Sequence, residues 1–275
     1  ALISALDNIW AESLSSKNVE QQASCTRYKT RLFDMLKAKI DDVTGALLGK
    51  ADQDMNDRME YQIEQSSGQD NSGVGLAMWT SLNEIRPIRK AINFASMGVQ
   101  IDVPKQILTQ EFKFAHRLLR MPMELYNSSA YQQGIEKVPA MAQKIVLGDV
   151  YIFDILFSPP QPYDLSAKKW VLRDRTAAAN ALKYSPYPSN VACKLIVKVP
   201  EKIVMSDDVV FSYLDTDTNA WSEDALTDYN YDKENNQVTF QCAKLGVFAF
   251  VMRRTVNFPY KSWSLTAIQD RAAGQ

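Results

Sequence analysis

The chain has 275 residues, of which 46% are hydrophobic and 23% are charged, so it can bury one or two ordinary globular cores. Its formal net charge of −1 gives no overall field that would attract nucleic acid or an anionic membrane, and neither is expected as a partner. No apolar run approaches the roughly 20 residues that a membrane-spanning helix needs. Because the chain opens at Ala1 inside a predicted helix, without an initiator methionine, we expect it to be part of a longer protein.

Apolar residues at helical spacing predict that residues 1–65 form a helical segment. One stripe contains Tyr28, Leu32, Met35, Leu36, Ile40, Val43 and Leu47. Ser24 is a candidate N-cap, Gly49 is a candidate helix end, and Met55, Met59 and Ile63 continue the four-residue spacing. Such a stripe packs either on its own chain or on a partner helix, and the first is about twice as common.

A Gly- and Ser-rich stretch at residues 66–75 predicts a linker after the helical segment. Short apolar runs then indicate strands at 74–82, 91–94, 97–103 and 144–157, with another apolar run at 112–119. We therefore predict a first β-rich domain at 76–158. Pro159, Pro160 and Pro162 cannot lie in a central strand, so the domain boundary is placed there.

The remaining strands predict an antiparallel β-sandwich at 159–265, followed by a tail at 266–275. Residues 194–200 alternate apolar and polar, 209–213 and 246–256 are apolar, and 229–240 reads as a hairpin closed by residues 233–237. The aromatic segment 257–265 is predicted to be the last strand. The expected fold class is α+β: a helical segment followed by two β-rich domains.

The residues that usually signal catalysis or metal binding lack their partners in this sequence. His116 is the only histidine and there is no nucleophile elbow, so we expect a structural role for it. Asp215, Asp217 and Asn219 match the start of a calcium loop, but Ala220 stands where that loop needs glycine, which favours an ordinary turn. We therefore expect no enzyme activity, no metal and no cofactor.

The three cysteines, Cys25, Cys193 and Cys242, are too scattered for a disulfide framework or a zinc cluster, and Cys193 and Cys242 are expected to be small buried residues in a reducing compartment. The paired carboxylates Asp207-Asp208 and Glu223-Asp224 are expected to be solvated loop charges, because neighbours on a strand point to opposite faces.

Two short basic groups are the candidate partner-binding residues. Arg86, Arg89 and Lys90 form one group, and Arg253 and Arg254, which follow the most apolar strand, form the other. A basic edge favours an acidic partner surface. The alternative for the second group is an edge strand protected from aggregation by its charges.

Three stretches together resemble the family called cancer susceptibility candidate one, or dynein axonemal intermediate chain seven. They are VGLAMWTSLNEIRPIRKAINFASMGVQIDVP at 74–104, DVYIFDILFSPPQP with WVLRDRT between 149 and 176, and LGVFAFVMRRTVNFPYKSWSL at 245–265. Their order and spacing make the resemblance more specific than any one of them.

The resemblance implies a non-catalytic accessory subunit of an inner-arm axonemal dynein, located in the axoneme of cilia or flagella. Its implied partners are other dynein intermediate, light or heavy chains, together with tubulin. A direct microtubule-binding adaptor outside a dynein complex is the alternative hypothesis, since the acidic tubulin surface favours a basic binding face. A ligand-binding sandwich is a third hypothesis, and it requires a deep polar pocket.

Overall fold

A computed structural model describes residues 2–67, 73–81, 90–104, 114–121, 144–157, 192–215, 217–218 and 220–256. The helical elements are α1 (Leu2–Ser15), α2 (Val19–Leu48), η1 (Ala51–Gln53) and η3 (Ala95–Met97). The strands of the N-terminal half and the middle are β1 (Glu60–Ser66), β2 (Gly75–Ser81), β3 (Lys90–Phe94), β4 (Val99–Val103), β5 (Phe114–Met121) and β6 (Lys144–Phe157). Those of the C-terminal part are β7 (Cys193–Lys198), β8 (Val209–Asp215), β9 (Ala220–Ser222), β10 (Leu226–Asp232), β11 (Gln237–Cys242) and β12 (Val247–Arg253).

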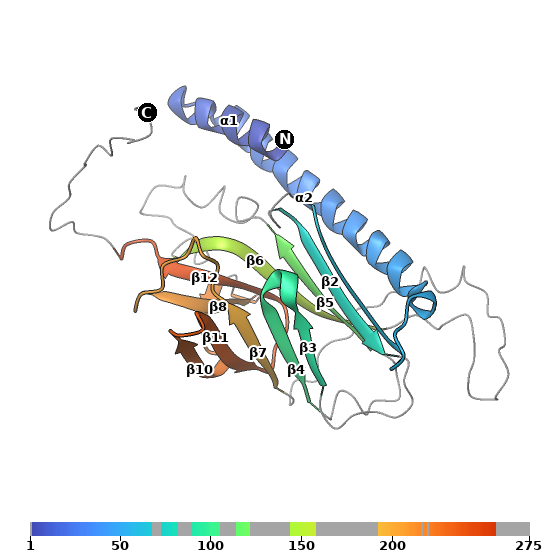
Figure 1. Ribbon diagram of the computed structural model, residues 1–275. Coiled ribbons are helices and arrows are strands. Elements are labelled where there is room, and N and C mark those ends of the chain that lie inside the picture. Colours follow the sequence, from blue (N-terminus) through green and yellow to red (C-terminus); the bar gives the residue numbers. More distant parts are fainter. Residues whose placement is uncertain are drawn as a thin grey trace, which may run out of the picture.

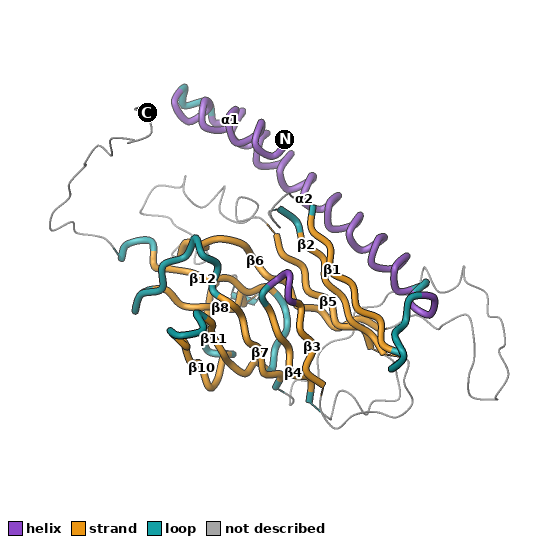
Figure 2. Tube along the Cα trace, viewed as in Figure 1, coloured by secondary structure: helices purple, strands orange, loops and turns teal. Residues whose placement is uncertain are grey.

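Two antiparallel sheets face each other, and a helix covers part of the outer face of one of them (Figures 1 and 2). Within the described ranges, one sheet has the strand order β1-β2-β5-β6-β12-β8-β9 and the other has the order β10-β11-β7-β4-β3. The α+β class and the antiparallel sandwich predicted from the sequence are confirmed.

Both sheets combine strands from either side of the predicted boundary at residues 158 and 159. β6 pairs with β12 in the larger sheet, and β4 pairs with β7 in the smaller one. The predicted division into ranges 76–158 and 159–265 therefore does not describe how the strands pair, because one sandwich uses strands of both. Prolines 159, 160 and 162, the segments 170–176 and 184–188, the aromatic stretch 257–265 and the tail 266–275 lie outside the described residues.

The core between the sheets is rich in phenylalanine. Phe211 lies at its centre, with its ring centroid 4.8 Å from that of Phe250 and 5.3 Å from that of Phe240. Phe153 meets Phe248 edge to face at 5.3 Å. Strands that border this core on one face alternate in burial, as β4, β7 and β11 do, and this period of two made them predictable.

β2 and β5 are buried on both faces, because one face meets the sandwich core and the other meets α2. The second contact joins Ile40 and Leu48 of α2 to Met78 of β2 and Leu119 of β5. Figure 1 shows α2 running over these strands, while α1 and the first half of α2 extend past their ends. The apolar runs of β2 and β5 therefore reflect two neighbouring layers rather than one.

The predicted helical segment is too long, because the chain leaves the helix at Leu48 and enters β1 at Glu60. Gly49 caps α2, as expected, with its N–H bonded to the Gly45 carbonyl. Met59 then has a positive φ of 57°, which no helix accommodates, and Ile63 pairs with Met78 in the sheet. The four-residue spacing of Met55, Met59 and Ile63 was coincidental.

One further local prediction needs correction. Asn18, not Ser24, is the N-cap of α2, since its side chain accepts a hydrogen bond from the Gln21 N–H at 3.1 Å. The predicted linker at 66–75 lies mostly outside the described residues, and its two ends, Ser66 and Gly75, lie opposite each other in the β1–β2 register.

One glycine shapes the longest strand. Along β12 the partner in β6 changes from Val150 to Leu147, which leaves Gly148 and Asp149 in a bulge, where Gly148 has a φ of +70°. A side chain at Gly148 would start 3.1 Å from the Cδ1 atom of Ile203. The bulge shifts the register between β6 and β12, so that β6 pairs with β12 on both sides of it.

Candidate partner-binding surfaces

The residues predicted to bind partners do not lie in one place. Arg86 and Arg89 are outside the described residues, and Lys90 is the first residue of β3, at the edge of the smaller sheet. Arg253 ends β12, inside the larger sheet, and Arg254 follows in a turn. Lys90 and Arg253 therefore lie in strands of different sheets.

Arg253 lies beside carboxylates rather than in a basic patch. Its Nη2 atom is 3.6 Å from Asp208 Oδ1, and its side chain is 72% exposed. Asp208 also lines a shallow pocket of about 160 Å³, together with Asp207, Glu223, Lys144 and Arg253. In this lining three carboxylates face two basic side chains, so the pocket offers an acidic partner little net attraction.

The predicted loop carboxylates make specific bonds in this region. Glu223 accepts a hydrogen bond from Ser212 Oγ at 2.6 Å and forms an ion pair with Lys144. Because Ser212 and Lys144 belong to β8 and β6, Glu223 holds the short β9 region against two other strands of the larger sheet. The exposed part of this cluster contributes little stability, as is usual for surface ion pairs.

His116 is buried in β5, with its ring centroid 6.0 Å from that of Trp79 in the neighbouring strand. Burial lowers its pKa from 6.5 to about 4, because the charged imidazolium would lose its hydration there. A neutral histidine packed on a tryptophan matches the structural role predicted for it.

The segment that resembles a calcium loop forms a turn between β8 and β9. The Asp217 N–H donates to Asp215 Oδ1 at 2.9 Å, and this bond lowers the pKa of Asp215. Asn219 lies outside the described residues. Across the described ranges, no three His, Cys, Asp or Glu side chains gather in a way that would hold a metal ion.

The three cysteines are buried free thiols, and the burial predicted for Cys193 and Cys242 is confirmed. Cys193 and Cys242 lie opposite each other in β7 and β11, and both face the sandwich core. Burial raises the pKa of the Cys242 thiol to about 11, which keeps it protonated and unreactive near neutral pH.

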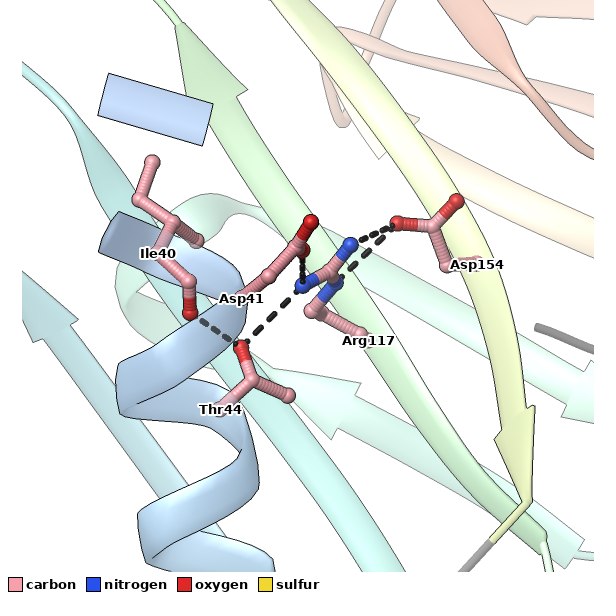
Figure 3. Close-up of polar contacts among 5 residues, drawn as sticks. All are labelled: Ile40, Asp41, Thr44, Arg117 and Asp154. Atoms are coloured by element: carbon pink, nitrogen blue, oxygen red, sulfur yellow. Dashed lines mark hydrogen bonds and ion pairs between the residues drawn. The ribbon is translucent and has the colours of Figure 1, made fainter. Parts of the chain in front are cut away.

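A buried arginine joins the helix to the sheet, and sequence reasoning did not identify it (Figure 3). Arg117 of β5 is 1% exposed. Its Nε and Nη2 atoms donate to Asp154 Oδ2 of β6 at 3.0 and 2.7 Å, and its Nη1 atom donates to Asp41 Oδ1 of α2 at 2.6 Å. Thr44 Oγ1 accepts a further bond from Nη1 at 3.1 Å and donates to the Ile40 carbonyl at 2.7 Å.

The signal for this cluster was present in the sequence. Arg117 interrupts an apolar strand, and Asp154 interrupts another, so each predicted a buried charge that needs a partner. Strand register supplies the pairing, since Arg117 lies directly opposite Asp154. The contribution of Asp41 depends on how α2 lies over the sheet, which no local pattern shows. The cluster acts as an anchor for α2 and offers no free group for chemistry.

An apolar opening lies between α1 and α2. This groove has a volume of about 500 Å³ and is lined by Ala5, Leu6, Ile9, Tyr28, Arg31, Leu32 and Met35. Tyr28 is 50% exposed and Met35 is 60% exposed, which is unusual for large apolar side chains on one helix face.

No helix in the described part of the chain is long and apolar enough to cross a membrane.

The comparisons with known proteins point to the family that the three sequence stretches resemble. A family model described as cancer susceptibility candidate 1 C-terminal matches residues 217–273. Dynein axonemal intermediate chain 7 of Danio rerio is 26% identical over an alignment of 149 residues, which covers 46% of this chain and 20% of that protein. The Homo sapiens protein of the same name is 24% identical over an alignment of 182 residues, which covers 62% of this chain and 24% of that protein.

The matched residues thus span about a quarter or less of each of these relatives. The family model begins in the turn before β9 and covers the strands β9 to β12. The resemblance drawn from the sequence is confirmed: this chain is similar, through its C-terminal residues 217–273 and at low identity over a longer stretch, to the cancer susceptibility candidate 1 family of dynein axonemal intermediate chain 7 proteins.

Proposed function

We propose that this chain is a non-catalytic accessory subunit of an inner-arm axonemal dynein, which helps to hold dynein intermediate chains in place in the axoneme of motile cilia or flagella. The similarity to relatives named dynein axonemal intermediate chain 7 supports this proposal more than any other observation. Its expected partners are other dynein intermediate, light or heavy chains.

The structure offers two features that suit a protein with an assembly role. The sandwich fills its own core with side chains, so its stability does not require a ligand between the sheets. The helix pair, in contrast, leaves large apolar side chains in contact with solvent, and such surfaces mark sites of protein association. The stable core thus lies in the sandwich, and the exposed apolar surface lies on the helix pair of the same chain.

Affinity purification from ciliated cells tests the proposed function. The 275-residue chain would be expressed with an epitope tag and recovered from detergent-extracted axonemes, beside an unrelated β-sandwich that carries the same tag. We expect inner-arm dynein intermediate and heavy chains with the tagged chain and not with the control. Recovery of the same proteins in both samples, or of no dynein chain, would count against the proposal.

Direct contact with tubulin is the second candidate, and Arg253, which is 72% exposed but lies beside Asp208, is the described residue at which it can be tested. Co-sedimentation with microtubules at two salt concentrations tests it, because a charge-based contact weakens as salt rises. Under this hypothesis, reversing the charges of Arg253 and Arg254 lowers the bound fraction. An unchanged bound fraction would exclude this surface and leave the segment of Arg86, Arg89 and Lys90 as the remaining predicted site.

A further inference from the structure

We propose that the groove between α1 and α2 binds an amphipathic helix of another protein chain, with apolar side chains on one face and acidic side chains flanking them. This inference deepens the proposed function by naming the surface and the chemistry of the partner. The groove is lined, among the described residues, only by α1 and α2.

The spacing of the groove residues suits a third helix. Tyr28, Leu32 and Met35 are separated by steps of four and three, and Ala5 and Ile9 repeat a step of four on α1. Steps of three and four form the seam by which helices pack side chains into holes at small crossing angles. From residue 28 to residue 35 the seam is about 10 Å long, which is enough for two turns of a partner helix.

This face of α2 is distinct from the face that packs on the sheet. Leu36, Ile40 and Leu47 contact the cluster between α2 and the larger sheet, whereas Tyr28, Leu32 and Met35 take no part in it. The groove therefore lies on the side of α2 that faces α1, while Phe33 and Leu36 of the same turns pack on the cluster beside the sheet. Figure 1 shows α1 lying along the first half of α2.

Charge selects an acidic partner. Two exposed arginines of α2, Arg27 and Arg31, lie at the groove. Arg31 lines the groove, and the Arg27 guanidinium carbon lies 5.4 Å from the centre of the Tyr28 ring. Glutamate or aspartate beside the apolar face of a bound helix would meet these cations. A second copy of this chain would instead bring the same basic residues against each other.

Fluorescence anisotropy with the whole 275-residue chain tests the proposal. The probe is a labelled helical peptide of about three heptads with leucine at the a and d positions and glutamate at the flanking e and g positions. Its matched control carries lysine in place of glutamate. We expect the glutamate peptide to bind at least about tenfold more tightly than the lysine peptide at low salt.

Variants locate the binding site. Met35→Asp places a charge in the groove and should weaken binding of the glutamate peptide about tenfold or more, and Arg31→Glu should weaken it severalfold. Lys37→Glu makes the same charge change on the opposite side of α2, and Val204→Asp alters an apolar residue that is 84% exposed and distant from the helices in sequence. Both controls should bind like the wild type, and circular dichroism verifies that each variant is folded.

Equal binding of the two peptides, or unchanged binding to Met35→Asp, would overturn the proposal. So would a dimer of the chain, detected by sedimentation, that Met35→Asp dissociates, because the groove would then bind a second copy. Purification of Met35→Asp from ciliated cells separates this inference from the proposed function. If dynein chains are recovered with the variant as well as with the wild type, the groove proposal fails while the proposed function stands.

Discussion

Replacing Asp154 by alanine should destabilise the fold more than any other removal of a carboxylate among the described ion pairs. Asp154 accepts two of the hydrogen bonds donated by Arg117, whose side chain is 1% exposed. Breaking a buried ion pair from one side costs about 3–5 kcal/mol, since the remaining charge stays buried without its partner. Asp41 and Thr44 still accept bonds from Arg117 Nη1, so the expected loss is at the lower end, about 3 kcal/mol.

The other carboxylate of the cluster should matter less for global stability. Asp41 is 34% exposed and accepts one bond from Arg117, so Asp41→Ala should cost about 1–2 kcal/mol. Its effect should be concentrated in α2, because Asp41 is the helix side of the anchor. Hydrogen exchange is expected to accelerate in the C-terminal half of α2 while the sandwich strands retain their protection.

Urea unfolding of the wild type and the variants measures these losses. Asp208→Ala is the matched control, since it removes a carboxylate from the exposed pair with Arg253 and should cost less than about 0.5 kcal/mol. The double variant Arg117→Met with Asp154→Leu should recover most of the stability lost in Asp154→Ala, because it removes the buried charge together with its partner. If Asp154→Ala and Asp208→Ala unfold at the same urea concentration, Arg117 is not the buried anchor that we describe.

Three further changes test separate parts of the fold. The pKa of His116 is about 4 in the folded state and 6.5 in the unfolded state, so the unfolded state takes up the proton first as the pH falls. The free energy of unfolding should therefore decrease by about 3 kcal/mol between pH 6.5 and pH 4. Urea unfolding across this range should show a shallower pH dependence for His116→Gln than for the wild type. Asn18→Ala should cost about 1 kcal/mol in thermal or urea unfolding while Ser24→Ala costs almost nothing, and the opposite ranking would restore the cap predicted from the sequence. Gly98 has a φ of +66° between η3 and β4, so Gly98→Ala should cost about 1–2 kcal/mol and Gly98→Asn less, whereas equal unfolding midpoints would show that this turn relaxes.

The strands were predictable because burial repeats with a period of two in β4, β7 and β11 and because β12 is continuously apolar. Their grouping was not predictable in the same way. Whether β6 pairs with a strand of its own segment or with β12 depends on contacts across about 100 residues of sequence, which leave no local period. The prolines at residues 159–162 therefore indicated a domain boundary, although each of the two sheets contains strands from both sides of it.

The helical region shows the same difference between local pattern and tertiary contact. Positive φ at Met59 and the side chain of Asn56, which accepts bonds from the Arg58 and Glu60 N–H groups, redirect the chain into β1. A spacing of four apolar residues does not reveal such a turn. The neighbours of the predicted partner-binding residue Arg253 could not be predicted either. Asp208 and Lys144 are distant from it in sequence, and only the fold brings them close to it.

The apolar stripe of α2 also shows that a local sequence pattern does not reveal which tertiary contact its residues make. The sequence shows one stripe from Tyr28 to Leu47, and it left open whether that stripe packs on its own chain or on a partner helix. The structure divides it: Ile40 and Leu47 pack on the sheet beside the Arg117 anchor, whereas Tyr28 and Met35 remain exposed. Burial and ion pairing at residues 40–48 can hold the helix in place, so the side of α2 that carries Tyr28 and Met35 can present an apolar surface without being needed for docking on the sheet. A loss of partner binding without a loss of stability is therefore expected for changes at Met35, and a loss of stability is expected for changes at Asp154.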